Sequence, residues 1–287
     1  MMKKNQILAL TGAACMSIAL LAGCGGSNND SNNEASTNDG EGEVVLSGTV
    51  ATGGSTSMQK LMSMLQEDFM AKNSGVDVTY DPTGSGAGIT GATDGSLDIG
   101  LSSRNLHDDE TEVESITVCL DGIAVVVNTA NPVTDLSMDQ LAGIFSGEIT
   151  NWSEVGGNDG EIVVIGREAG SGTRDGFESI VGVEDICVYA QELTATGAVT
   201  AAVAANENAI GYASLSAVDE SVNSVAVDGV ACTEETVKDG SYAVQRPFNF
   251  VIKKDAELSE AAQAFITYVT DGSANEWILE AGCVPIA

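Results

Sequence analysis

The stretch IVVIGREAGSGTRDGFESI, residues 162–180, carries the pattern from which the fold class follows. It opens with Ile162–Ile165, a β-branched run typical of a buried strand. It closes with Thr173–Ile180, where apolar residues recur at helical spacing. Between the two lies a loop of glycines and hydroxyl side chains at 166–173. The stretch therefore predicts a strand, a loop and a helix in succession, which is the repeating unit of an α/β protein.

The same alternation continues on both sides of this unit, from Val44 toward the C-terminus. Alternating strand and helix patterns favour an α/β fold over an all-helical or all-β one. The predicted strands are Val76–Tyr80, Leu97–Gly100, Ile116–Asn128, Ile162–Ile165, Ala209–Ala213 and Phe248–Lys253. The predicted helices are Ser57–Lys72, Met138–Phe145, Thr173–Ile180, Gly197–Ala205 and Ser259–Thr270.

Two of these strands suggest a chain that leaves one lobe, builds a second and returns. Ile116–Asn128 is long and apolar on both sides of Asp121-Gly122, and Phe248–Lys253 follows after an intervening set of elements. Two crossings between lobes would have this appearance. A pair of ordinary core strands in a single sheet would have it too.

The N-terminus has the layout of an export signal. Lys3 and Lys4 precede an apolar run, Ile7–Leu21, which at about fifteen residues is short for a membrane span. Leu21-Ala22-Gly23-Cys24 then resembles the bacterial lipoprotein cleavage box, in which the cysteine becomes the lipid-bearing first residue. An ordinary secretory signal with an incidental cysteine is the alternative. Residues 24–43 are polar enough to predict a disordered tether behind lipidated Cys24.

Composition excludes several function classes. The 287 residues include 42 acids and 11 bases, a formal net charge of −31, which repels nucleic acid and anionic lipid. His107 is the single histidine and no C-x-x-C occurs, so the sequence offers few side chains that could form a metal site or a Cys–His nucleophile pair. We therefore expect no metal, no cofactor and no catalytic residue. The cysteines beyond the leader could be free or paired: Cys119, Cys187, Cys232 and Cys283.

Four loops share a chemistry that suits an anion despite the acidic composition. Each combines glycine with Ser or Thr, and each adjoins a predicted strand or helix end. Helix starts leave backbone N–H groups unpaired, glycines allow close approach, and hydroxyls add neutral donors. Simple helix caps and turns would use the same residues. A G-x-G-x-x-G match at Gly86–Gly91 leaves too little room before the next strand for a full crossover helix, which argues against a dinucleotide site. The four loops are Thr52–Ser57, Thr83–Gly88, Asp98–Arg104 and Gly166–Thr173.

Together these loops closely resemble the phosphate-binding lipoproteins of bacterial phosphate ABC transporters. The longest shared motifs are GREAGSGTRDGFE (166–178) and IFSGEITNWSEVGG (144–157). The others are TGGSTSMQKL (52–61), TGSGAG (83–88), DIGLSSR (98–104), DGIAVVVN (121–128), AIGYASL (209–215) and AGCVPIA (281–287).

The resemblance implies a two-lobed periplasmic-binding-protein-like fold of type II, with two crossing hinge segments, Asp121–Asn128 and Arg246–Phe250, and the ligand in the interlobe cleft. Residues 1–23 would be the lipoprotein signal peptide, 44–120 plus 248–287 lobe 1, and 121–247 lobe 2. If the cysteines pair, Cys119–Cys283 and Cys187–Cys232 would keep each bridge within one lobe.

Site residues follow from the resemblance position by position. Asp98 would accept a hydrogen bond from a phosphate O–H and thereby reject sulfate, and Arg167 would pair with the anion. Ser103 and Arg104 are further candidates. The remaining phosphate-binding residues would be Ser55, Thr56, Ser85, Ser171, Gly172 and Thr173.

The implied function is a non-catalytic, high-affinity receptor that delivers inorganic phosphate to the permease subunits of an ABC transporter. It would be a monomer, anchored by its palmitoylated N-terminus to the outer face of the cytoplasmic membrane. Receptors for sulfate or molybdate and a phosphate sensor uncoupled from transport are the alternatives. A phosphatase would require a metal cluster, an activated nucleophile or a P-loop lysine, and the sequence shows none of these patterns.

Overall fold

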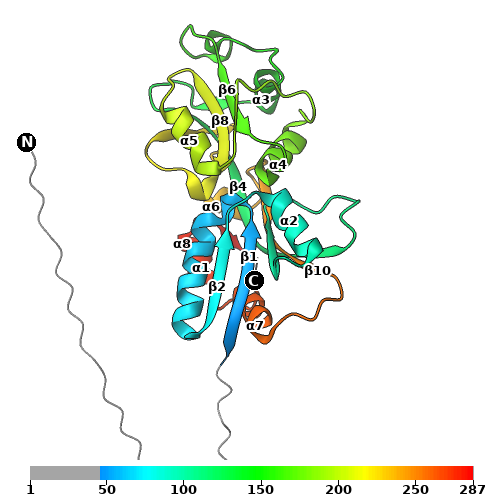
Figure 1. The fold of residues 1–287 in the computed structure, drawn as a ribbon. Coiled ribbons are helices and arrows are strands. Elements are labelled where there is room, and N and C mark those ends of the chain that lie inside the picture. Colours follow the sequence, from blue (N-terminus) through cyan, green and yellow to red (C-terminus); the bar gives the residue numbers. More distant parts are fainter. Residues whose placement is uncertain (1–45, 287) are drawn as a thin grey trace, which may run out of the picture. The chain divides into compact units, whose positions relative to one another are not determined.

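The structure, a computed structural model, describes residues 46–286 (Figure 1). The predicted signal peptide, Cys24 and the tether lie outside the described residues. The strands are β1 (Ser47–Gly54), β2 (Gly75–Asp81), β3 (Ile99–Ser102), β4 (Val113–Asn128), β5 (Asp135–Leu136), β6 (Val163–Arg167), β7 (Gln191–Leu193), β8 (Ala209–Ser214), β9 (Val222–Val227), β10 (Gln245–Lys253) and β11 (Val284–Pro285). The helices are α1 (Gln59–Lys72), α2 (Ser85–Asp94), α3 (Met138–Phe145), α4 (Gly172–Val181), α5 (Thr196–Ala204), α6 (Glu234–Lys238), α7 (Glu260–Thr270) and α8 (Asn275–Glu280), with 3-10 turns at Thr56–Met58, Trp152–Val155 and Leu215–Ala217.

The strands hydrogen-bond in the order β2-β1-β3-β10-β4-β8-β6-β7. At one end β1 pairs in parallel with β2 and β3, and at the other β6 pairs in parallel with β8 and β7. The two middle strands, β10 and β4, run antiparallel to each other. In Figure 1 the blue and cyan β1, β2 and α1 lie beside the orange α7 and the red α8, so both ends of the described chain build the same body.

Two large hydrophobic cores underlie this arrangement, beside a small cluster of Ile89, Ala92, Val113 and Val251. One is formed by buried residues between Val50 and Cys119 together with those between Phe248 and Cys283. The other is formed almost entirely by residues between Ile123 and Val244. We call the elements around the first core lobe 1 and those around the second lobe 2. The two-lobed α/β architecture expected from the sequence is therefore present.

The chain crosses between the cores twice, on neighbouring strands. In β4, Cys119 belongs to the first core and Ile123 to the second; in β10, Val244 precedes the strand in the second core and Phe248 lies in the first. At the crossing, Arg246 pairs in register with Asp121. The crossings thus lie at Asp121 and Arg246, the first residues of the two segments predicted as hinges. The later part of the first segment, Ile123–Asn128, packs inside lobe 2.

All predicted strands and helices are present within a few residues, but one loop was assigned wrongly. Residues 83–88 contain the start of α2, which begins at Ser85. The glycines here serve close packing, because a Cβ at Gly88 would lie 2.7 Å from the Gly53 carbonyl oxygen. A ten-residue helix therefore fits where the sequence predicted too little room for a full crossover helix.

The four cysteines of the described chain are free thiols. Burial raises the pKa of Cys187 to about 11 and that of Cys232 to about 12, so both stay protonated at neutral pH.

Candidate functional site

The first group of predicted residues meets at the carboxyl ends of β1 and β3. Gly54 ends β1 with φ of 132°, and a Cβ there would lie 2.3 Å from the Leu101 carbonyl oxygen, so only glycine permits this approach. The next residue, Ser55, donates from Oγ to Ser103 Oγ at 2.8 Å. Ser103 Oγ also lies 3.2 Å from Ser85 Oγ, at the start of α2. Three buried hydroxyls from three separate loops of lobe 1 therefore lie together.

The start of α4, in lobe 2, lies against this group. Ser171 caps the helix by accepting from the Arg174 N–H. Thr173 Oγ1 lies 2.7 Å from Ser57 Oγ of lobe 1. A Cβ on Gly172 would lie 2.5 Å from Ser85 Oγ and 2.9 Å from Ser103 Oγ. The N-terminus of a ten-residue helix, with its unpaired N–H groups, is thus apposed to hydroxyls from the other lobe.

Arg167 connects the same cluster to the interior of lobe 2. Its Nη1 donates to Thr196 Oγ1 at 3.0 Å, and Nε and Nη2 donate to the carbonyl oxygens of Leu193 and Thr194. Thr196 Oγ1 in turn lies 2.9 Å from Ser57 Oγ. Arg167 is only 2% exposed, and burial lowers the pKa of its guanidinium.

What distinguishes Arg167 is the lack of a negative partner. The chain has four arginines, and in the described part Arg104, Arg174 and Arg246 each have a carboxylate within 4.0 Å. Arg167 has none there; the three acceptors of its guanidinium are all neutral. Burying an unpaired charge is costly, so this position favours an anionic ligand.

A family model described as a PBP superfamily domain matches residues 33–273. The chain belongs to the PBP superfamily. Phosphate-binding protein PstS of Bacillus subtilis (strain 168) is 30% identical to it, over 99% of this chain and 95% of that protein.

Solved structures lead to the same family. A substrate-binding protein from Clostridium perfringens, assigned to a phosphate ABC transporter and crystallised with bound phosphate, is 39% identical with a TM-score of 0.81; the match covers 84% of this chain and 100% of that one. An ABC-type phosphate transport receptor from Vibrio cholerae is 36% identical with a TM-score of 0.69, over 82% and 99% of the two chains. The resemblance and the type II fold inferred from the loops are therefore confirmed.

One predicted site residue of this PBP superfamily chain lies elsewhere. Asp98 precedes β3, and its Oδ2 accepts the Ala51 N–H at 2.8 Å. Ser103 follows the opposite end of that four-residue strand, five residues from Asp98, a separation of roughly 16 Å at about 3.3 Å per residue. Asp98 therefore lies outside the hydroxyl cluster: its carboxylate fixes the start of β3 against β1, and Ser103 is the residue of DIGLSSR that joins the cluster.

Arg104, a further predicted residue, has carboxylate partners. Its guanidinium pairs with Glu110 at 2.7 Å and with Asp175 at 3.0 Å. Burial acts to lower the pKa of Arg104, but the two carboxylates together raise it above its ordinary value. Arg104 is thus already neutralised, unlike Arg167.

Two members of the cluster were not predicted. Ser57 stood in the first loop but looked like a helix residue, and it contacts both Thr173 and Thr196. Thr196 starts α5, and its hydroxyl bridges Arg167 to Thr56, 140 residues earlier in the chain. Nothing local marks Thr196 in the sequence, because its role depends on a contact across the two lobes.

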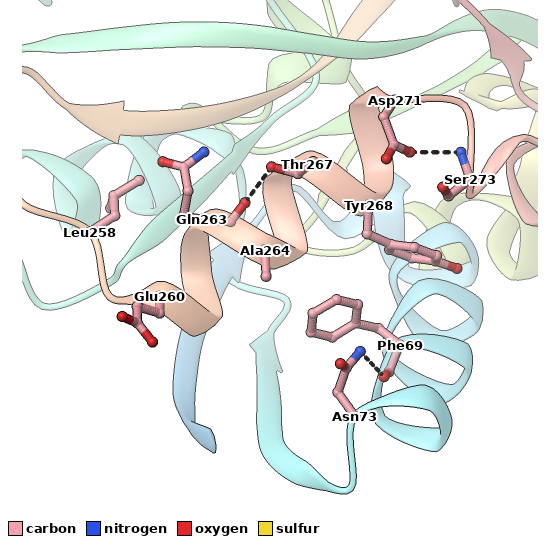
Figure 2. A pocket seen from close by; sticks show the side chains of 10 residues that line it. All are labelled: Phe69, Asn73, Leu258, Glu260, Gln263, Ala264, Thr267, Tyr268, Asp271 and Ser273. Carbon is pink, nitrogen blue, oxygen red and sulfur yellow. Dashed lines mark hydrogen bonds between the residues drawn. The ribbon is translucent and has the colours of Figure 1, made fainter. Parts of the chain in front are cut away.

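A hollow separate from the hydroxyl cluster, drawn in Figure 2, lies in lobe 1 between α1 and α7. It measures about 620 Å³ and includes Glu260 and Asp271 but neither lysine nor arginine. A lining that includes carboxylates and no cationic side chain disfavours an anion, so this hollow is a poorer candidate for phosphate than the hydroxyl cluster.

Removing the charge of Asp98 should leave phosphate binding intact. In Asp98→Asn the amide oxygen can still accept the Ala51 N–H, so the strand start is kept. We expect the phosphate dissociation constant, measured by calorimetry, to stay within about threefold of wild type, since the side chain lies outside the cluster. A loss of tenfold or more would return Asp98 to the site.

Proposed function

We propose that the protein is an extracytoplasmic receptor that binds inorganic phosphate between its two lobes and delivers it to the membrane subunits of an ABC transporter, without catalysing a reaction. The observation that carries this is Arg167, a buried guanidinium whose partners are all neutral. The seven hydroxyls around it and the N-terminus of α4 can complete an oxyanion site. They belong to Ser55, Thr56, Ser57, Ser85, Ser103, Thr173 and Thr196.

Phosphate is favoured over sulfate by the chemistry of hydroxyls. Each Ser or Thr hydroxyl can donate one hydrogen bond and accept others, so a protonated phosphate oxygen has acceptors available. The names of the relatives from Bacillus subtilis and Vibrio cholerae support the same ligand. With Asp98 removed from the site, preference depends on this hydroxyl cluster and not on a carboxylate.

Calorimetry with phosphate, arsenate, sulfate and molybdate tests the proposal. We expect tight binding of phosphate and arsenate, which share shape and protonation, and weak binding of the other two. Sulfate or molybdate binding within tenfold of phosphate would instead favour a general oxyanion receptor.

We propose the lobe limits 44–120 plus 248–287 and 121–247, supported by the change of core along β4 and β10. Closure of the lobes on phosphate would then bend the chain at the two crossings.

We also propose that Cys24 carries the membrane anchor, because it follows Leu21-Ala22-Gly23 after a charged and then apolar leader. Among the helices of residues 46–286, none is long and apolar enough to cross a membrane. Cys24→Ser should release the protein from the cell surface. Intact mass of the membrane-extracted wild-type protein provides the check, and an unmodified residue 24 would contradict the anchor.

A further inference from the structure

We propose that Arg104 and Asp175 form an ion-pair latch that holds the two lobes together over the bound anion and so sets the affinity of the proposed phosphate site. The proposal depends on the function given above.

The two residues are placed next to the hydroxyl cluster but on opposite lobes. Arg104 directly follows Ser103, in the loop between β3 and β4. Asp175 lies in the first turn of α4, two residues after Thr173. Each latch residue therefore shares a backbone segment with a residue of the cluster, and a force between them acts on the segments that enclose the anion.

The guanidinium of Arg104 is oriented by contacts within its own lobe. Its Nη1 and Nη2 donate to the two carboxylate oxygens of Glu110 at 2.8 and 2.7 Å, a bidentate pair of fixed direction. Glu110 is itself held by the His107 N–H at 2.7 Å. This leaves the Nε edge of the guanidinium facing lobe 2.

Asp175 meets that edge, with Oδ2 at 3.0 Å from Nε. Nε makes no hydrogen bond of good geometry in the described structure, so the contact is electrostatic in character. The side chains are 8% and 29% exposed, which places the pair where charges interact more strongly than at an open surface. Because the partners belong to different lobes, this attraction exists only when the lobes are closed.

A hollow of about 300 Å³ borders the pair and keeps it within reach of solvent ions. Its walls include Arg104, Asp175 and Gln245, from the two lobes and the crossing strand. Added salt should therefore weaken the attraction between Arg104 and Asp175 more than it weakens the attraction between the buried Arg167 and the bound anion.

The test compares phosphate dissociation rates and affinities of wild type, Asp175→Asn, Arg104→Gln and the double variant. We expect Asp175→Asn to lose about tenfold in affinity, or about 1.4 kcal/mol, through faster dissociation. The double variant should bind no worse than Arg104→Gln alone, since the two side chains act through one contact. Asp109→Asn is the matched control: Asp109 is an exposed carboxylate in the same loop of lobe 1, and its loss changes the net charge by the same amount as Asp175→Asn, so we expect a change within about threefold.

The results can distinguish a failure of the latch from a failure of the proposed function. Additive losses in the double variant, or equal losses in Asp109→Asn and Asp175→Asn, would overturn the latch while leaving phosphate binding in place. A wild type that binds no phosphate would instead overturn the proposed function. In that case small-angle scattering without phosphate still tests the latch: Asp175→Asn should expand the protein at low salt more than Asp109→Asn does, and equal radii of gyration would contradict it.

Discussion

Arg167→Met is expected to lower phosphate affinity by about 10³-fold, or about 4 kcal/mol, a greater loss than we expect from any other single substitution. Arg167 is the only arginine of residues 46–286 without a carboxylate partner, so phosphate would lose the charge that neutralises it in a buried site. Calorimetry at fixed ionic strength measures the loss.

Thermal unfolding separates this role from a structural one. Without phosphate the buried charge of Arg167 lacks a counter-ion, so an apolar side chain of similar length removes a desolvation cost but also three hydrogen bonds, and we expect the melting temperature to change little. Lys60→Gln is the control, because Lys60 is exposed on α1 and its loss changes the net charge by the same amount. Phosphate affinity retained within tenfold in Arg167→Met would remove Arg167 from the site.

Gly172→Ala is expected to weaken phosphate binding by about 30-fold or more while the protein still folds. The added Cβ would lie 2.5 Å from Ser85 Oγ and 3.0 Å from the carbonyl carbon of Ser103. A serine side chain can rotate, but the Ser103 backbone is fixed at the end of β3, so the lobes could not close fully. Overpacking of this kind costs about 1–3 kcal/mol.

The matched control for Gly172→Ala is one turn further along α4. A Cβ at Gly176 would lie 3.4 Å from Ile123 Cδ1, an ordinary contact, so Gly176→Ala should bind phosphate like wild type. Scattering with saturating phosphate completes the test: wild type and Gly176→Ala should compact, and Gly172→Ala should compact less. Identical compaction and affinity in all three would show that Gly172 does not limit closure.

Local patterns were sufficient to predict many of the elements that build the two lobes, but not β1, α2 or β9. The apolar run in β4 and the helical stripe in α1 are properties of neighbouring residues, and both elements lie where the sequence predicts them. The loops of the site were identifiable for the same reason, since Gly54 and Gly172 stand where strands end or helices begin.

Single motifs do not predict which side chains contact one another in the site, because those contacts depend on the tertiary structure. Asp98 and Ser103 belong to one motif, yet β3 places them at opposite ends of a strand, and only the ends of β1 and β3 together show which of them faces the cluster. Thr196 reaches Thr56 and Arg167 only after both lobes have folded. The orientation of Arg104 was likewise hidden, because Asp175 lies in the other lobe.

A crystal structure of the protein with arsenate, located by the anomalous scattering of arsenic, tests the central claim most directly. Arsenate has the shape and protonation of phosphate, and the arsenic peak marks the anion without ambiguity from water. We predict one strong peak between the lobes, with arsenate oxygens in hydrogen-bond contact with the Arg167 guanidinium, the Ser55 and Ser103 hydroxyls and the first N–H groups of α4. A peak confined to the hollow between α1 and α7, or one that contacts a single lobe and leaves Arg167 without an anionic partner, would contradict the account.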